Sequence, residues 1–495
     1  DLETRGHALT MAASATRLTD ASLAGADLRR IGVPAYDRSS IRTGVLHIGP
    51  GAFHRAHQAD YFDLLLASDP RWGIHGVSMK SASLRDAIQP QDGLYTLAIL
   101  DKQVRYRVIG ALTQVSTVTG HAWRETFLSP DLHLVTLTVT EKGYCLGTGD
   151  ALDFSHPDIT ADLSDRSCPS SVIGLLVEGL RLRYAAGLAP VTVLSCDNLP
   201  SNGQKLRDAI LAFTAAIDQK LFEWISVNIA FPCSMVDSIT PATDHALRSK
   251  VSEATGLADA WPIQREAFTS WVIEDKIGPG FPDLSRVGAV MTNDVEAHEK
   301  AKLRMLNGAH STLAYLGLAL GHQTVSDAMQ DAALAAMIDR MMRREIAAGL
   351  RAPTGLDLDA YRLALLNRFR NPAIPHQLSQ IAWDGSKKLP MRLLDTIFEN
   401  LRAGRSIEGL ATGVAAWMRF VRRSARNGSE ITDPLADRLI RIGAACSDTP
   451  DADVALFLEL DEVFPLALVS QTAFVEKMKW AYARVTALES GEEQL

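Results

Sequence analysis

A polar set interrupts an otherwise apolar, helix-periodic segment at residues 298–321. This segment contains Glu299, Lys302, Asn307 and His310. At 100° per residue their side chains fall within an arc of about 140°, so one helix face carries a carboxylate, an amine, an amide and an imidazole. A lysine that is partly desolvated in a cleft has a lowered pKa and acts as a base near neutral pH, and a nearby carboxylate can relay its proton. A solvated Glu299–Lys302 pair at i,i+3, with the other two side chains merely hydrogen-bonded, explains the spacing equally well.

A second amide stands at the end of an apolar run. Asn198 closes the strand-like stretch VTVLSCDN. In an open parallel sheet the carboxyl ends of the strands form the edge that binds ligands. We therefore expect Asn198 and Asn307 to hold one substrate oxygen together. A turn-forming role for Asn198 ahead of Leu199-Pro200 is an equal alternative.

This residue set is suited to removing hydride from an alcohol without a metal. Such a reaction needs a group that takes the hydroxyl proton and donors that hold the developing alkoxide. The sequence lacks the Tyr-xxx-Lys pair of short-chain reductases, and its five cysteines form no CxxC pair. The zinc motif HExxH also fails, because Lys302 stands where a second histidine would have to follow His298-Glu299. We assign no metal-binding residue.

A glycine turn predicts where a dinucleotide binds. In VLHIGPGAFHRAHQ an apolar strand runs into Gly49-Pro50-Gly51 and then into an amphipathic helix. Glycines at such a turn let the backbone approach a pyrophosphate, towards which the helix directs free N–H groups. His54 occupies the position of the third glycine of GxGxxG. A tight strand-to-helix turn without a ligand remains the alternative.

The next strand carries the residues that distinguish NAD from NADP. An acid at the end of this strand binds the ribose hydroxyls of NAD, whereas a cation tolerates the extra phosphate of NADP. The sequence GVSMKSASLRD supplies Lys80, Ser81 and Ser83 before the first acid, Asp86. A solvated surface lysine is the commoner reason for a residue such as Lys80. We expect NAD as the cofactor, with NADP not excluded.

Two domains are needed to position these residues. Short apolar runs at 44–49, 73–79, 133–140, 191–198 and 231–240 alternate with helical patterns at 54–67 and 170–187. This alternation predicts an α/β fold with a Rossmann-type, doubly wound, largely parallel sheet. After about residue 295 the pattern becomes mostly helical. We therefore predict a dinucleotide-binding domain at 11–293 and a helical substrate and catalytic domain at 294–495.

Composition excludes several other classes of protein. The chain has 495 residues with 50 basic and 58 acidic side chains, a net charge of −8, which argues against nucleic acid as a partner. No apolar stretch reaches the roughly 20 residues that span a bilayer. The odd number of cysteines is typical of reduced thiols in the cytoplasm. Met11 is expected to be the native start, and the sequence carries no signal for an oligomeric state.

The motifs GPGAFHRAHQADY, TVTEKGY, SCDNLPSNG, FPCSMVDSITP, KLRMLNGAHS and RFRNPAI occur in this order between residues 49 and 374. With them the chain resembles the polyol-specific long-chain dehydrogenase family, also called the mannitol dehydrogenase family. The resemblance implies a Rossmann-type domain, a helical domain and metal-free hydride transfer in the cleft between them. It also implies that Lys302 is the general acid/base, that Asn198 and Asn307 bind the reacting oxygen, that His310 contacts substrate and that Glu299 lies on a proton path. The resemblance further implies that Gly49, Gly51, Phe53 and Arg55 flank the cofactor and that Val236 and Asp237 lie near nicotinamide. From their places in the glycine turn and after the next strand, Ala52 and Lys80 are two further candidate cofactor residues.

The stretch from Asn371 to Ile397 bears on the substrate. It contains DGSKKLPMR, which looks more like the fructuronate reductase branch of the family than the mannitol branch, and Gln380 stands where an arginine is expected in mannitol enzymes. A uronate carries a carboxylate, for which Lys387, Lys388 and Arg392 are candidate partners. The implied reaction interconverts D-mannonate and D-fructuronate. The alternatives are a mannitol 2-dehydrogenase or another polyol or hexuronate dehydrogenase, and more remotely a non-catalytic dinucleotide sensor.

Overall fold

The computed structural model describes residues 15–495, so the expected start at Met11 lies outside the described residues. The chain divides into two compact units between Asn293 and Asp294. These are called the N-terminal and C-terminal units below, and each is described by itself. In residues 15–495 no helix has the length and apolar character that crossing a membrane requires.

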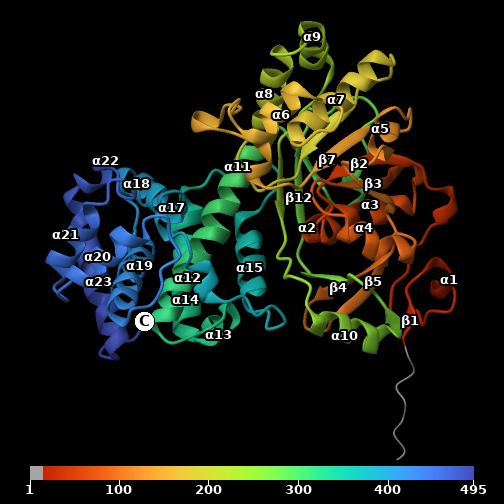
Figure 1. Ribbon diagram of the computed structural model, residues 1–495. Coiled ribbons are helices and arrows are strands. Elements are labelled where there is room, and N and C mark those ends of the chain that lie inside the picture. Colours follow the sequence, from red (N-terminus) through yellow and green to blue (C-terminus); the bar gives the residue numbers. More distant parts are fainter. Residues whose placement is uncertain (1–14) are drawn as a thin grey trace, which may run out of the picture. The chain divides into compact units, whose positions relative to one another are not determined.

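The N-terminal unit is built on a five-stranded parallel sheet (Figure 1). The strand order is β6-β3-β2-β7-β8, with bounds Leu112–Thr117, Gly73–Ser78, Thr43–Ile48, Leu134–Leu137 and Thr192–Ser195. All four neighbouring pairs are parallel. Apolar side chains on both faces of β2 are buried, which is why its sequence reads as an unbroken apolar run. The predicted Rossmann-type fold is confirmed.

Helices cover both faces of this sheet. Leu46 and Ile48 pack on one face with helices α5 (Ala122–Phe127), α7 (Val172–Ala185), α8 (Asn202–Ala215) and α9 (Gln219–Asn228). Val45 packs on the other face with α3 (Gln58–Leu66) and α4 (Ser83–Ile88). The remaining helices of the unit are α1 (Asp20–Leu23), α2 (Ala52–Ala56), α6 (Pro157–Ser164) and α10 (His245–Thr255).

The structure corrects two expectations about local elements. The run 231–240 does form a strand, β9 (Ser234–Asp237), but it lies outside the parallel sheet and pairs antiparallel with β12 (Ser270–Glu274), next to β13 (Val290–Thr292). The helix expected at 54–67 is broken at His57, where φ −117° and ψ −86° separate α2 from α3. The unit also contains the sheet β11-β4-β5 (Ile263–Glu266, Tyr95–Leu100, Arg105–Ile109) and the pair β1-β10 (Thr16–Arg17, Leu257–Ala258).

The C-terminal unit is helical, as predicted. Its α-helices are α11 (Val295–Ala301), α12 (Gly308–Ala319), α13 (Val325–Gln330), α14 (Ala332–Met341), α15 (Leu358–Phe369), α16 (Leu378–Ile381), α17 (Gly385–Leu389), α18 (Asp395–Arg402), α19 (Glu408–Asn427), α20 (Ala436–Ala445), α21 (Pro450–Leu458), α22 (Leu466–Val469) and α23 (Thr472–Ser490). Three π-helical segments join some of them, at Lys302–Asn307, Met342–Ile346 and Pro390–Leu394. Apolar side chains of α12, α14, α19 and α23 meet in one core.

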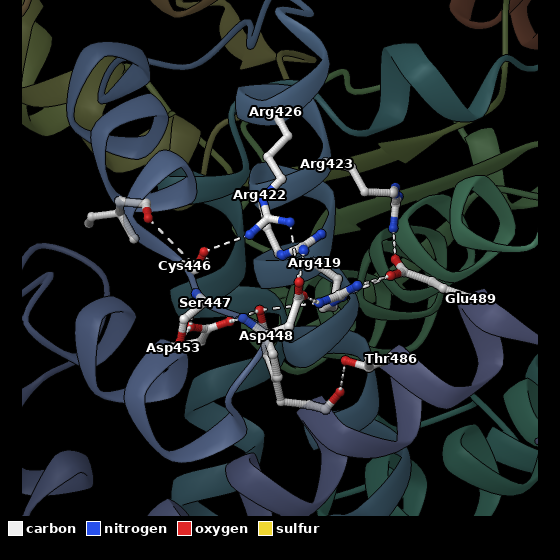
Figure 2. A network of polar contacts seen from close by, with 12 residues as sticks. Arg419, Arg422, Arg423, Arg426, Cys446, Ser447, Asp448, Asp453, Thr486 and Glu489 are labelled. Carbon is white, nitrogen blue, oxygen red and sulfur yellow. Dashed lines mark hydrogen bonds and ion pairs between the residues drawn. The ribbon is translucent and has the colours of Figure 1, made fainter. Parts of the chain in front are cut away.

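A cluster of ion pairs lies at the carboxyl-terminal half of α19 (Figure 2). The buried Arg419 donates from Nη1 to Asp448 Oδ1 at 2.8 Å and from Nε to Glu489 Oε2 at 2.8 Å. The other arginines in the cluster also pair with these two acids, namely Arg422 and Arg426 with Asp448 and Arg423 with Glu489. The cluster joins α19 to α23 and to the loop ahead of α21.

Candidate active site

The glycine turn has the backbone that a dinucleotide site requires. Gly49 adopts φ +82°, and a Cβ there would lie 2.4 Å from the carbonyl oxygen of Thr138. Any other residue would therefore be strained and would clash with the strand β7 side of the turn. Gly51 occupies the N-cap of α2 without a side-chain cap. The turn thus exposes backbone N–H groups directly beyond β2.

His54 fills the position of the missing third glycine. Its ring stacks on that of His47 in β2, with centroids 3.3 Å apart and planes at 15°. His47 is held by the hydroxyls of Thr136 at 2.7 Å and Thr138 at 3.0 Å. Burial lowers the pKa of His47 to about 3 and that of His54 well below its usual range. Two neutral, stacked imidazoles therefore fill the helix–strand interface that a glycine would otherwise close.

We predict that this stack makes the stability of the N-terminal unit pH-dependent. A histidine in an unfolded chain titrates near 6.5, whereas buried His54 stays neutral, so the unfolded state alone takes up its proton and stability is lost as the pH falls below 6.5. When the pH is lowered from 7 to 5, the free energy of unfolding falls in both proteins. We expect this fall to be about 2 kcal/mol smaller in His54→Leu than in the unsubstituted protein. Urea unfolding at the two pH values measures this difference.

The control is His121→Leu, which replaces an exposed histidine and should leave the pH dependence of the free energy of unfolding unchanged. An equal loss in all three proteins would contradict the prediction.

A cavity of about 940 Å³ opens beside the glycine turn. Five of the predicted cofactor residues line it, namely Gly49, Gly51, Ala52, Arg55 and Lys80. Its volume lies in the range of small-molecule and cofactor pockets. The other three predicted residues do not line it: Phe53 stacks on His57 at 5.0 Å between centroids, and Val236 and Asp237 are buried in β9.

Arg55 is the buried cation of this cavity. It is 1% exposed, donates from Nη1 to the carbonyl of Trp261 at 2.9 Å, and lies over the rings of Tyr95 and Trp261. Burial lowers its pKa to about 10, so the guanidinium remains charged at neutral pH. Its Nε has no hydrogen-bond partner within residues 15–495. A charged donor of this kind fits the pyrophosphate of a dinucleotide.

A loop on the cavity wall brings together three groups that can also ligate metals. Donor atoms of Cys145, His156 and Asp158 lie within 4.8 Å of one another. Burial raises the pKa of the Cys145 thiol to about 11, and His156 Nδ1 accepts a hydrogen bond from the backbone N–H of Asp158 at the start of α6. We interpret these contacts as structural and derive no metal chemistry from them.

Asn198 lies just beyond the end of β8, and its neighbours are tied down by a buried network. Asp197 accepts hydrogen bonds from the backbone N–H groups of Val139 at 2.8 Å and Thr140 at 2.7 Å and from the hydroxyl of Tyr144 at 2.7 Å. Burial raises the pKa of Asp197, and these donors oppose the rise. The network thus attaches the loop after β7 to the residue that precedes Asn198.

Asn202 completes this support. Its Nδ2 donates to the carbonyls of Asp197 at 3.0 Å and Ser234 at 2.8 Å, and its Oδ1 accepts from the N–H of Ser234 at 2.9 Å. The beginning of β9 is thereby fixed to the end of β8. Sequence reasoning missed Asp197, Asn202 and Tyr144 as positioning residues, although they lie inside the motifs SCDNLPSNG and TVTEKGY.

In the C-terminal unit the predicted polar face lies across a π-helical segment. Lys302–Asn307 is π-helical between α11 and α12, so it contains about one residue more per turn than an α-helix. This extra residue rotates Asn307 and His310 back by about 100°, and the arc of the four polar side chains narrows from about 140° to about 80°. The polar face is therefore tighter than uniform α-helical geometry predicts.

Within the π-helical segment, the polar face is more exposed to solvent than most of the other residues. Glu299, Lys302 and Asn307 are half-buried, while the next residues along the segment, Arg304 to Leu306, are buried. The neighbouring cations are neutralised elsewhere, since Glu399 accepts hydrogen bonds from Lys300 Nζ at 3.3 Å and from Arg304 Nη2 at 2.7 Å. Helix geometry places Lys302 on the same side as Asn307 and His310, whereas Lys300 and Arg304 are bound to Glu399.

His310 is buried in an aromatic and cationic environment. Its ring contacts Phe369 at 4.6 Å and meets His376 edge-on at 5.4 Å between centroids. Burial, followed by the charges of His376, Arg368 and Arg392, holds the pKa of His310 well below its usual range. In residues 15–495 no hydrogen-bond partner reaches His310 Nε2. The ring is neutral at pH 7 and retains one polar atom for a ligand.

Arg392 reaches the same helix from the π-helical segment Pro390–Leu394. Its Nη1 donates to Ser311 Oγ at 3.1 Å and lies 3.5 Å from the carbonyl oxygen of Asn307. The approach is close because Gly308 has no side chain: a Cβ there would lie 2.8 Å from the carbonyl oxygen of Arg392. Burial lowers the pKa of Arg392 to about 10, which leaves it charged.

The other predicted substrate residues divide into two groups. Lys388 is half-buried and donates from Nζ to the carbonyl of Ile381 at 3.3 Å, and burial together with the charge of Arg392 lowers its pKa. Burial, followed by the charge of Lys388, lowers the pKa of His376, whose ring contacts His310. Lys387 and Gln380, by contrast, are exposed. The structure thus groups Lys388 and Arg392 with His310, and it adds His376, which sequence reasoning missed.

Comparisons with known proteins agree on one family. The domain family described as "Mannitol dehydrogenase Rossmann domain" matches residues 43–286, and "Mannitol dehydrogenase C-terminal domain" matches residues 294–486. The D-mannonate oxidoreductase of Escherichia coli is 38% identical over 91% of this chain and 95% of its own length. Two solved structures each match 96% of this chain and 99% of their own chain. One is a D-sorbitol dehydrogenase in substrate-free form, which is 31% identical with a TM-score of 0.89. The other is the Pseudomonas fluorescens mannitol 2-dehydrogenase in ternary complex with NAD and D-mannitol, which is 35% identical with a TM-score of 0.79.

Proposed function

We propose that this chain, which belongs to the mannitol dehydrogenase family of oxidoreductases, interconverts D-mannonate and D-fructuronate. As a member of that family it is a secondary-alcohol dehydrogenase that uses a nicotinamide cofactor. The substrate, the residue roles and a cytoplasmic location are the parts that we propose. The relative named D-mannonate oxidoreductase supports this choice of substrate.

The observation that carries the substrate proposal is the pair of half-buried cations, Lys388 and Arg392, beside His310. Within residues 15–495 both hydrogen bonds of the Arg392 guanidinium use Nη1, which leaves Nε and Nη2 to bind an anion. Neither Lys388 nor Arg392 forms an ion pair with a carboxylate of the described chain. Burial and the charge of Arg392 lower the pKa of Lys388 even though the charges of Asp384 and Asp433 oppose this shift, so a further anion would stabilise the two cations. A uronate supplies that anion, whereas a neutral polyol does not.

The catalytic residues then act as follows. Gly49, Gly51 and Arg55 would hold a nicotinamide cofactor, which would supply the hydride acceptor for oxidation of the substrate carbon and the hydride donor for its reduction. In oxidation neutral Lys302 takes the proton of the C5 hydroxyl as the carbon loses hydride, and Glu299 passes that proton towards solvent. In reduction Asn198 and Asn307 donate hydrogen bonds to the ketone oxygen, and protonated Lys302 delivers the proton to it. His310 Nε2 hydrogen-bonds a substrate hydroxyl.

A substrate panel tests this proposal. We expect reduction of D-fructuronate to exceed that of D-tagaturonate and D-fructose, with each rate followed by cofactor absorbance. Arg392→Ala should raise the KM for D-fructuronate about 10- to 100-fold, since a charged hydrogen bond contributes about 1.5–3 kcal/mol, and should change the KM for D-fructose little. Arg402→Ala is the control, because Arg402 is exposed at the end of α18. Preference for D-fructose, with equal effects on both substrates, would favour a mannitol 2-dehydrogenase and refute the uronate assignment.

A further inference from the structure

The loop after β3 carries one lysine and several serine hydroxyls in the position that usually carries an acid. Ser78, Met79, Lys80, Ser81 and Ser83 line the dinucleotide cavity at this point. β3 is the neighbour of β2, which leads into the glycine turn, so this loop corresponds to the ribose-reading position of a Rossmann-type site. The first acid after β3 is Asp86, which pairs with Arg85 at 2.7 Å and does not line the cavity.

The charged residues that line the cavity are mostly cationic. Arg55, Lys80 and Lys142 are its cationic lining residues. Among the described residues Asp158 is its only carboxylate, and it lies with Cys145 and His156 on the chain that follows β7. Within residues 15–495 neither Lys80 nor Lys142 forms an ion pair. Among the described residues that line the cavity, those that follow β3 directly include no carboxylate that could accept hydrogen bonds from the ribose hydroxyls of NAD or repel a phosphate.

Two serine hydroxyls of this loop, those of Ser81 and Ser83, lie next to one another. Ser81 Oγ and Ser83 Oγ lie 2.7 Å apart, and the backbone N–H of Ser83 donates to Ser81 Oγ at 3.1 Å. This turn holds two hydroxyl groups close to Lys80 in the chain. An ammonium group on a flexible stem together with hydroxyl donors is a common means of binding phosphate.

We propose that residues 78–83 form a subsite for the 2′-phosphate of NADP(H), with Lys80 as its cation and Ser81 and Ser83 as hydroxyl donors. The protein then accepts NADP(H) as well as NAD(H). This inference rests on the proposed function only in that the cavity binds a dinucleotide, and it is independent of the identity of the sugar substrate.

Calorimetric titration of the whole protein with 2′,5′-ADP and with 5′-AMP tests the subsite without any turnover. We expect 2′,5′-ADP to bind at least five-fold more tightly than 5′-AMP. Lys80→Glu should weaken 2′,5′-ADP binding about 10- to 100-fold and leave 5′-AMP binding unchanged or stronger. Lys102→Glu introduces the same charge change at an exposed position away from the cavity and is the matched control.

Each contrary outcome has a distinct meaning. If 2′,5′-ADP binds no more tightly than 5′-AMP, or if the two variants weaken it equally, the 2′-phosphate subsite is refuted. Failure of the protein to bind either nucleotide would overturn the dinucleotide cavity as well. A preference for D-fructose over D-fructuronate would refute the proposed substrate and leave this inference standing.

Discussion

Replacement of Lys302 by alanine is expected to lower kcat by about 10²- to 10⁴-fold, the range that general acid–base catalysis contributes. Lys302 stands at the start of the π-helical segment, on the same helix face as Asn307 and His310. Removing its amine takes away the proposed base for the substrate proton, while the cavity that we propose for the cofactor is lined by residues of the N-terminal unit. Steady-state kinetics should therefore show a loss in kcat, and calorimetry should show unchanged affinity for the cofactor.

A control variant and a rescue experiment distinguish the loss of the Lys302 amine from a general effect of the substitution. Lys300→Ala removes an exposed amine two residues away that pairs with Glu399, and it should retain near-normal turnover. Added primary amines should partly restore the rate of Lys302→Ala, because a small amine can occupy the vacated space and accept the proton. Near-normal turnover of Lys302→Ala, or an equal loss in the Lys300 variant, would remove Lys302 from the mechanism.

Replacement of Glu489 by glutamine is expected to destabilise the C-terminal unit by about 3–5 kcal/mol. Glu489 in α23 pairs with Arg419 and Arg423 of α19 (Figure 2), and the side chain of Arg419 is only 6% exposed. Without the Glu489 charge these guanidinium groups stay desolvated with weaker compensation. For a unit of this size the change corresponds to a fall in Tm of roughly 6–20 °C, which scanning calorimetry measures directly.

A second glutamate near the end of α23 supplies the control. Glu493 pairs with Arg484 at 3.4 Å, and its side chain is 46% exposed. Exposed ion pairs contribute about 0–1 kcal/mol, so Glu493→Gln should leave the transition almost unchanged. A similar small shift in both variants would show that the α19–α23 cluster contributes no more than a surface ion pair.

The sequence alone was sufficient to predict the features that depend only on residues close together in the chain. The apolar run of β2, the glycine turn and the following helix are local in the chain, and together they predict a Rossmann-type domain. The change to helical periodicity after about residue 295 likewise predicts the helical character of the C-terminal unit. The grouping of Lys302, Asn307 and His310 on one face follows from the helix period, because these residues lie within three turns of one another.

Other features depend on contacts between distant parts of the chain. Arg392 reaches the carbonyl of Asn307 across 85 residues of sequence, through a close approach that only Gly308 permits. The strand β9 has the apolar run that is typical of a buried parallel strand, yet it pairs antiparallel with β12, because an apolar run does not specify which strand is the partner.

The π-helical segment is the clearest case in which tertiary structure decides the site. Nothing in KLRMLN distinguishes it from an α-helix, since its residue types have ordinary helix propensities. The segment instead lies against Pro390–Leu394, from which Arg392 makes its contacts. Packing between distant segments therefore determines how narrow the arc of the polar side chains is, whereas the sequence by itself determines only which side chains that face carries.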